Sequence, residues 1–252
     1  ELVDSNGIVP IRLSEKEYVR AHDFRRYLHK NLEDFIVETP LEHPLGLLNK
    51  KFDVSLINDI QNKWVPYNFE SENIDDFLEN LNIDKTVEIS SIRGGYSNAL
   101  KQLNKFIEVG YQDYAQYRSD PSKEASSQLS PYFHSGQIST HEVFDKISEL
   151  ESWSPESINP KMVGRREGWW GSSDNFESFM DELITWRELG YHTCVRRANY
   201  NQYSSLPEWA IKTLHEHSSD EREYIYSLDE LTYSKTHDEI WNAAQNQLRT
   251  QG

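Results

Sequence analysis

The 252-residue sequence contains a single cysteine, Cys194, and no long apolar run. One cysteine excludes an internal disulfide and favours a reducing compartment, so we expect a cytoplasmic protein. Because no apolar run approaches about 18 residues, we expect no membrane span. The sequence starts without methionine in a strand-like pattern, from which we expect a fragment or a processed chain.

Motifs of several enzyme classes are also missing. The chain has no phosphate-binding GxxxxGK[ST] loop, no GxGxxG and no nucleophile elbow. The pairs His215–His217 and His192–Cys194 have no partners at metal-ligand spacing. A helical HxH also does not place both imidazole rings on one side of the helix. We therefore expect no metal in this protein.

The charge balance is strongly acidic, with a net charge of −16. This argues against a protein that coats nucleic acid over most of its surface, although it allows a local basic face. Aromatic residues make up 12% of the chain and include seven tryptophans, so we expect an aromatic-rich core. The length allows one large domain, or one domain with pieces of another.

The first third of the chain is predicted to contain the end of a sheet, a helix and a long linker. The turn-forming letters DSNG separate two short β-rich runs within Glu1–Leu13, which we expect to belong to a sheet mostly outside this chain. A capping box at Ser14–Glu17 predicts a helix through about Phe35 with a basic stripe, which is typical of a solvated face. The proline-, asparagine- and acid-rich stretch that follows, to about Gly94, predicts a long linker with short helices.

Beyond that linker every regular element reads as helical, so the predicted fold class is mainly α. Apolar spacing and helix-start signals indicate the elements. The predicted helices are Tyr96–Tyr117, a short one opening at Ser130–Pro131, Val143–Leu150 after the capping box Ser139–Glu142, Phe176–His192 capped at Asp174–Glu177, one from Pro207 to about His217, and Asp238–Leu248, with further capping boxes at Ser227–Glu230 and Thr236–Glu239.

The helix Phe176–His192 carries a conflict that points to a site. Most of it should be buried, yet Glu182 lies within about 40° of Trp186 in the apolar sector of the helix. A buried carboxylate needs a partner, so Glu182 either pairs with Arg187 or another basic residue, or lines a polar cavity. The polar residues Asp181, Thr185, Glu188 and His192 are expected on the opposite side.

Two loops each have a ligand-binding interpretation and a purely structural one. The loop Ser126–Ser130 precedes a helix start, where hydroxyls and free N–H groups suit a phosphate, although ordinary helix capping explains it as well. The loop Glu151–Gly171 places Lys161, Arg165 and Arg166 among tryptophans. Such a pattern can grip a nucleic-acid backbone and stack on bases, or it can be a structured loop whose tryptophans cap the core.

Several motifs together resemble one family. These are Tyr114-x3-Arg118-x2-Pro121, SxLSPYFHSGQIS at 127–139, DELITWREL at 181–189, LPEWA…TL..H at 206–217 and THDEIWNAAQ at 236–245. Their order and spacing resemble the flavin-binding half of DNA photolyases, closest to the class II group that repairs cyclobutane pyrimidine dimers. The opening VDSNGIVPIRLS resembles the last strand region of that family's antenna domain.

The resemblance implies a domain plan and a cofactor. It implies the end of an α/β antenna-type domain at 1–14, a helix and interdomain linker at 15–93, and an all-helical FAD-binding domain at 94–252 that is incomplete at its C-terminus. The implied FAD-binding residues are Tyr114, Ser126, Ser127, Gln128, Leu129, Ser130, Arg187, Trp241 and Asn242.

The resemblance also implies a reaction. Glu182 would hydrogen-bond the damaged base and Trp186 would stack against it, as the catalytic pair of a carbon–carbon lyase driven by light through reduced FAD. Arg118 matches a position near the DNA backbone. Extruding a pyrimidine dimer is favoured because its stacking is weakened. The implied partner is damaged DNA, and we expect a monomer.

The sequence departs from the family pattern at some positions. The chain stops before the helices that complete the flavin pocket and the tryptophan electron-transfer chain, and His141 and Glu142 stand where a basic residue is common. The GRREGWW loop is not part of the common pattern, so we interpret Arg165 and Arg166 as alternative DNA contacts. Two other hypotheses remain, a cryptochrome-like photoreceptor without repair activity and a helical interaction module without cofactor.

Overall fold

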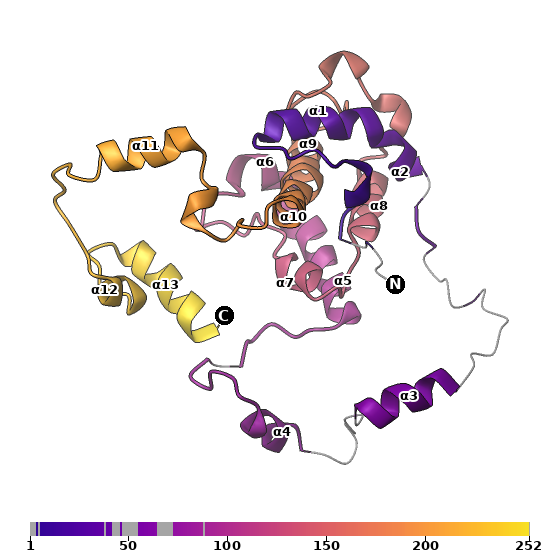
Figure 1. The fold of residues 1–252 in the computed structure, drawn as a ribbon. Helices are drawn as coiled ribbons and strands as arrows, with labels where there is room; N and C mark the ends of the chain where they lie inside the picture. The colour runs from indigo at the N-terminus through magenta and orange to yellow at the C-terminus, as the bar shows by residue number, and fades with distance from the viewer. Residues whose placement is uncertain are drawn as a thin grey trace. The chain divides into compact units, whose positions relative to one another are not determined.

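The computed structural model describes residues 4, 6–37, 39–41, 46, 55–64, 73–87 and 89–251. Within these ranges every regular element is helical, which confirms the predicted mainly α class (Figure 1). The chain divides into two compact units, one of Glu1–Glu42 with Gly94–Ser218 and one of His43–Arg93 with Ser219–Gly252. None of the helices in the described ranges is both long and apolar enough to cross a membrane.

Among the described residues, the first unit contains most of the helices and all of the buried apolar side chains. Its elements are the 3-10 turn η1 (Ile11–Leu13), α1 (Ala21–Asn31), α2 (Glu33–Val37), α5 (Tyr96–Lys105), the π-helical segment η3 (Phe106–Gly110), the 3-10 turn η4 (Tyr111–Asp113), α6 (Tyr114–Tyr117), α7 (Ser130–His134), α8 (Thr140–Leu150), the 3-10 turns η5 (Pro155–Ser157) and η6 (Pro160–Met162), α9 (Asp174–Met180), the π-helical segment η7 (Asp181–Trp186), α10 (Arg187–Arg196), the 3-10 turn η8 (Tyr203–Ser205) and α11 (Glu208–Glu216).

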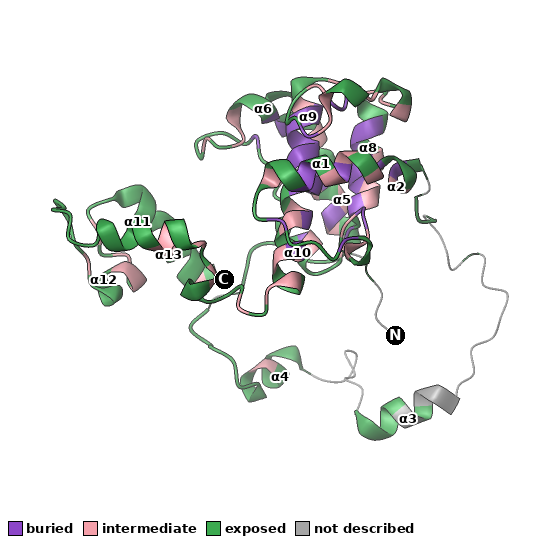
Figure 2. Ribbon diagram, turned by 45° about the horizontal axis from the view of Figure 1, so that its top comes forward, coloured by how far each residue is buried: buried purple, intermediate pink, exposed green. Residues whose placement is uncertain are grey.

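The second unit is smaller. It contains α3 (Ser55–Lys63), α4 (Ile74–Asn80), α12 (Leu228–Thr232) and α13 (Glu239–Gln251). Its described residues are exposed or half-buried (Figure 2). The predicted capping box at Ser227 is present, since its hydroxyl accepts from Glu230 N–H and the Glu230 carboxylate accepts from Ser227 N–H.

The continuous helix of α9, η7 and α10 is the centre of the first unit (Figure 2). Phe179 on this helix contacts Phe106 and Tyr114 with ring centroids 5.2 Å apart in each pair. Such aromatic pairs contribute about 0.5–1.5 kcal/mol each beyond their buried area. Phe176, Met180 and other apolar residues of this helix are also buried, so the predicted burial of this element is observed.

The helix predicted at Tyr96–Tyr117 is not one continuous α-helix. It is broken into α5, the π-helical η3, the 3-10 turn η4 and α6. The break lies where the backbone passes close to the next loop, because a Cβ added at Gly110 would lie 2.7 Å from the Glu124 carbonyl oxygen. Wider and tighter turns relieve such local constraints, and π-helical segments are frequent at functional sites.

The N-terminal strands are a prediction that the described residues contradict. Residues 6–9 form bends and Ile11–Leu13 form η1. The backbone N–H groups of Ile8 and Val9 donate to the Glu188 carboxylate, at 2.6 and 3.3 Å, so they are satisfied without a partner strand. Residues 1–3 and 5 lie outside the described residues.

The helix predicted from the Ser14–Glu17 box starts later and is divided. Ser14 bonds the Tyr18 hydroxyl at 3.0 Å instead of capping a helix, and α1 begins at Ala21. The helix is then split into α1 and α2. Ser139 caps α8 as predicted. The start of α9 differs from the prediction, because Ser173 and not Asp174 is its N-cap.

Candidate functional site

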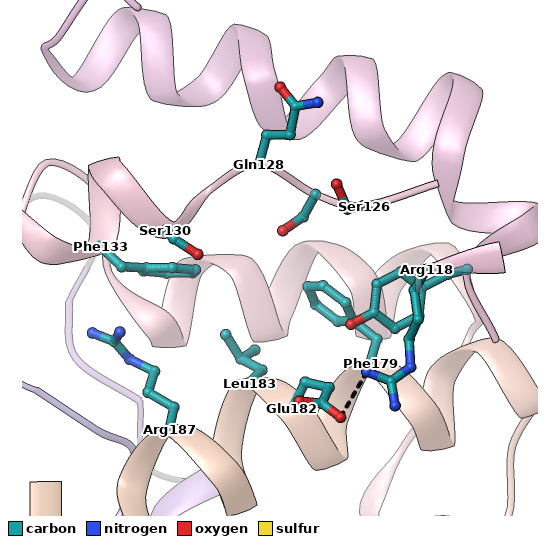
Figure 3. Close-up of a pocket in the computed structure, with 11 residues that line it drawn as sticks. Arg118, Ser126, Gln128, Ser130, Phe133, Phe179, Glu182, Leu183 and Arg187 are labelled. Carbon is teal, nitrogen blue, oxygen red and sulfur yellow. Dashed lines mark ion pairs between the residues drawn. The ribbon is translucent and has the colours of Figure 1, made fainter. Parts of the chain in front are cut away.

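A cavity of about 370 Å³ in the first unit brings together eight of the residues singled out from the sequence. They come from three separate segments, namely α6 with its C-cap, the loop before α7, and the central helix (Figure 3). The eight are Tyr114, Arg118, Ser126, Ser127, Gln128, Ser130, Glu182 and Arg187. Phe133, Phe179 and Leu183 also line the cavity, and they were not among the candidate site residues.

The loop from Ser126 to Ser130 contains a residue with left-handed backbone. Gln128 has a φ of 52°, in the left-handed region that non-glycine residues rarely adopt. The loop is held by Gln102, whose side-chain amide donates to the Ser127 carbonyl oxygen at 2.9 Å. Strained backbone of this kind clusters at ligand-binding loops, because the surrounding structure has to enforce it.

Glu182 has a structural partner and also lines the cavity, so both alternatives for it hold. Arg118 Nη1 lies 2.8 Å from Glu182 Oε1, and the two side chains are 25% and 34% exposed (Figure 3). The partner is therefore Arg118 and not Arg187. Solvent screening makes such a half-exposed pair weak, so Arg118 can release Glu182 to another polar group at little cost.

Tyr114 forms the neighbouring part of the wall. Burial raises the pKa of its hydroxyl to about 12, with Arg118 acting in the opposite direction and Glu182 in the same direction. The hydroxyl therefore stays protonated at neutral pH and remains a hydrogen-bond donor. The Arg118 guanidinium lies 5.9 Å from the Tyr114 ring, which adds a cation–π contact to the same wall.

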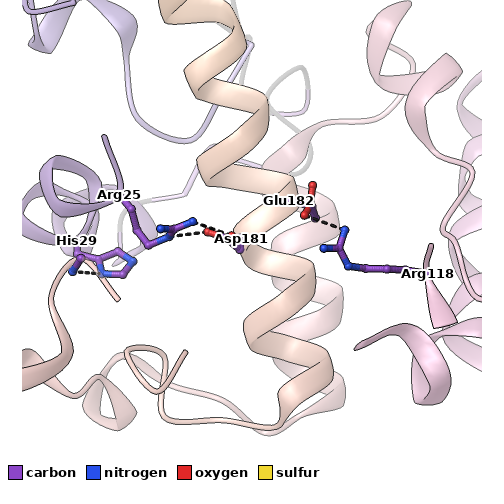
Figure 4. A network of polar contacts seen from close by, with 6 residues as sticks. Arg25, His29, Arg118, Asp181 and Glu182 are labelled. Carbon is purple, nitrogen blue, oxygen red and sulfur yellow. Dashed lines mark hydrogen bonds and ion pairs between the residues drawn. The ribbon is translucent and has the colours of Figure 1, made fainter. Parts of the chain in front are cut away.

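Asp181 and Glu182 are adjacent in sequence but reach opposite sides of the central helix (Figure 4). Asp181 forms a two-bond ion pair with Arg25 of α1, at 2.8 and 2.9 Å. The side chains of this pair are only 8% and 5% exposed. The structure thus separates a buried structural carboxylate from a half-exposed one that faces a cavity.

The side of the helix expected to be polar is buried, which corrects the sequence interpretation. Asp181, Thr185, Glu188 and His192 are all less than 5% exposed. They are covered by α1 and the N-terminal segment, whose backbone N–H groups use the Glu188 carboxylate. Burial raises the Glu188 pKa to about 8 against the effect of these two hydrogen bonds.

Arg187 and Trp186 occupy different positions relative to the cavity. Arg187 lines it, donates from Nε to the Asn6 carbonyl oxygen at 3.3 Å, and lies 4.8 Å from the Phe133 ring. Trp186 is 48% exposed and is not among the residues that line the cavity. A large exposed aromatic ring on a mostly buried helix is a candidate contact surface.

The three further predicted cofactor residues are Leu129 of the first unit and Trp241 and Asn242 of the second unit. Leu129 is fully buried and precedes α7. Trp241 and Asn242 belong to α13 of the second unit. There the Asn242 side-chain oxygen accepts from Thr236 N–H at 3.0 Å and its amide donates to the Thr236 carbonyl at 2.8 Å, which fixes the start of that helix.

The tryptophans and the arginines of the loop Glu151–Gly171 lie in different environments. Trp169 and Trp170 are 1% and 4% exposed, as expected of tryptophans that cap a core. Trp169 stacks on His29 with ring centroids 3.9 Å apart. Both arginines are exposed instead, and they line a different cavity of about 690 Å³ beside α1.

No group of three or more potential metal-ligating side chains occurs in the described ranges.

The imidazole of His29 on α1 is held in a neutral state by its surroundings. His29 accepts a hydrogen bond from Gly164 N–H through Nδ1 at 3.1 Å (Figure 4). Burial, assisted by Arg25, lowers the His29 pKa to about 3, so this ring is a neutral acceptor at physiological pH.

Comparison with known proteins gives consistent results. The deoxyribodipyrimidine photo-lyase of Methanothermobacter thermautotrophicus is 34% identical over 247 residues, which cover 98% of this chain and 46% of that protein. The deoxyribodipyrimidine photo-lyase of Potorous tridactylus is 30% identical over 254 residues, covering 99% of this chain and 41% of that protein. Cryptochrome-2 of Arabidopsis thaliana is 48% identical over 50 residues, 20% of this chain and 8% of that protein.

The chain spans less than half the length of the two photolyases it matches. No family model matches the chain.

Proposed function

The chain belongs to the photolyase and cryptochrome family, and we propose that the protein uses FAD and light to repair cyclobutane pyrimidine dimers in DNA. The observation that carries this proposal is the cavity of the first unit. It gathers the loop Ser126–Ser130, Tyr114 and Glu182, which the sequence resemblance assigned separately to cofactor and lesion. The same family contains photoreceptors, so repair is the part that needs a direct test.

The chemistry of the cavity fits a diphosphate-containing cofactor. Serine hydroxyls from the loop before α7 and the guanidinium group of Arg187 supply donors and positive charge for an anion. The volume of about 370 Å³ is within the range of small-molecule sites. The residues proposed to hold FAD are Tyr114, Ser126, Ser127, Gln128, Leu129, Ser130, Arg187, Trp241 and Asn242.

The chain's own residues then have separate tasks. When bound, FAD supplies the light-excited electron that reopens the dimer. Glu182 is proposed to hydrogen-bond the damaged base once its ion pair with Arg118 opens, and the exposed ring of Trp186 is proposed as the stacking surface. Arg118, once released, is proposed to bind a DNA phosphate. The tight turn at Gln128 is proposed to present the serine hydroxyls to the cofactor phosphates.

The test uses the complete protein and a dimer-containing oligonucleotide. Flavin absorption and light-dependent repair are measured for the wild type and for Glu182→Ala. We expect the variant to keep its flavin and to lose about tenfold or more in repair rate, equivalent to about 1.4 kcal/mol. Glu149→Ala is the matched control, because it removes an exposed carboxylate of α8 that pairs with Lys146 three residues away.

The outcomes separate the alternatives. Full repair by Glu182→Ala contradicts the role given to this carboxylate. Flavin absorption without repair in the wild type supports a photoreceptor. Absence of flavin from the purified protein supports a helical interaction module.

A further inference from the structure

The second cavity of the first unit is basic, although the chain as a whole is acidic. It has a volume of about 690 Å³ and lies between α1 and the loop after η6. Arg26, Arg165 and Arg166 line it and are exposed. Within the described part of the chain, none of these three arginines has an ion-pair partner. The three arginines thus form a local cluster of positive charge on a chain whose net charge is −16.

The other charged groups at this cavity do not cancel the three arginines. Arg25 also lines it, but its guanidinium is bound to Asp181 by two hydrogen bonds. His22 lies 3.5 Å from its neighbour Asp23 and is largely exposed. Glu167 is the one carboxylate among the described lining residues. The cavity therefore keeps an excess of positive charge.

The loop that carries Arg165 and Arg166 is fixed onto α1 rather than hanging free. Gly164 donates its N–H to the neutral His29 ring, which in turn stacks on the buried Trp169. Gly164 has a φ of 85°, and a Cβ added there would lie 3.2 Å from the Arg26 Cβ. This close approach holds the two arginines of the loop beside the arginine of the helix, in a preorganised arrangement.

We propose that Arg26, Arg165 and Arg166 form a phosphate-binding site. Planar guanidinium groups bind phosphate oxygens in two-bond geometry, and three unpaired arginines around one cavity suit a phosphate better than a carboxylate of single charge. The site is distinct from the cavity with Glu182, because the Arg25–Asp181 pair and the Arg118–Glu182 pair lie on opposite sides of the central helix (Figure 4). The phosphate comes from the backbone of DNA or from a free phosphorylated molecule.

The first experiment measures binding of inorganic phosphate to the complete protein by phosphorus NMR, in the dark. We expect Arg26→Ala and the double variant Arg165→Ala/Arg166→Ala to weaken binding at least tenfold. Arg165→Lys/Arg166→Lys should retain part of the affinity, because it keeps the charge and loses the two-bond geometry. The matched control is Arg20→Ala/Lys161→Ala, which removes two exposed cations near the cavity that do not line it.

The second experiment identifies the source of the phosphate with a short undamaged duplex, measured by fluorescence anisotropy at several salt concentrations. If the backbone is the source, the double alanine variant binds the duplex more weakly. Its salt dependence also becomes shallower, by a slope of about 0.9 for each DNA phosphate that the variant no longer neutralises. If a free phosphorylated molecule is the source, the variant loses phosphate binding and keeps duplex binding.

The proposal is overturned if the alanine variants bind phosphate like the wild type, or if the control variant loses as much. The circular dichroism spectrum of each variant separates lost binding from lost folding. Neither measurement needs flavin or light, so a protein that fails the repair test still decides this proposal.

Discussion

The buried ion pair between Arg25 and Asp181 allows a prediction whose size follows from the structure. Its two hydrogen bonds are 2.8 and 2.9 Å long, and both side chains are nearly excluded from water. Replacing Arg25 by methionine keeps the apolar stem but leaves the Asp181 carboxylate buried and unpaired. Removing one partner of a buried pair costs about 3–5 kcal/mol. We therefore expect Arg25→Met to lower the free energy of unfolding by about that amount.

The assay is urea unfolding followed by tryptophan fluorescence. With a denaturant slope of about 2 kcal/mol/M, the loss corresponds to a midpoint lower by about 1.5–2.5 M. The double variant Arg25→Met/Asp181→Leu should recover most of the stability, because well-packed apolar residues replace buried ion pairs at little cost. The exposed pair Lys212–Glu216 is the control, and Lys212→Ala should cost less than about 0.5 kcal/mol. A loss below about 1 kcal/mol in Arg25→Met, or no recovery in the double variant, refutes the reasoning.

Two other predictions concern single residues. The Glu188 pKa is raised to about 8 in the folded protein, so folding takes up a proton there. The free energy of unfolding therefore falls as pH rises from about 5 through 8, by up to about 1.4 kcal/mol per pH unit. Glu188→Gln should remove this fall, which is measured as the difference between urea midpoints at pH 6 and pH 9. Equal midpoint shifts in both proteins would contradict it. Gly171→Ala should be more destabilising than Gly136→Ala, although both glycines have positive φ. A Cβ at Gly171 would lie 2.1 Å from the Ser157 carbonyl oxygen, whereas a Cβ at Gly136 would meet no atom within 4 Å. Thermal melts should show a cost of about 1–2 kcal/mol for Gly136→Ala and more for Gly171→Ala, and equal costs would exclude the clash.

Apolar spacing and capping signals predicted the helical class, and the family resemblance singled out eight of the residues that line the cavity. Ser139 and Ser227 start their helices as predicted, since a capping interaction depends on only a few neighbouring residues. The partner of Glu182 could not be predicted, because Arg118 is 64 positions away and only the packing of α6 on α9 brings them together. The sequence allowed Arg187 or another basic residue as the partner, and it named Arg187 because that residue is near in the chain.

The failures also have a physical cause. The N-terminal pattern Ile-Val-Pro-Ile has β propensity, but a strand requires a neighbour for its N–H groups. Here the buried Glu188 carboxylate supplies the acceptor, 180 positions from Ile8. That long-range contact also explains why a face with four polar residues is buried. Periodicity marked those residues as polar and could not show that a second segment would satisfy them.

The π-helical register of η7 connects the structural and the candidate functional parts of the central helix. Asp181 is held by α1, and this fixes the rotation of the segment about its axis. Because Glu182 follows on the same backbone, the direction in which its side chain enters the cavity is set by a contact on the other side of the helix (Figure 4). A weak, half-exposed pair with Arg118 can then open without moving the backbone, since the strong buried pair carries the positional constraint. The role proposed for Glu182, in which a substrate base replaces Arg118 as its partner, requires both a fixed backbone and a weak ion pair. The adjacent residues Asp181 and Glu182 supply one each.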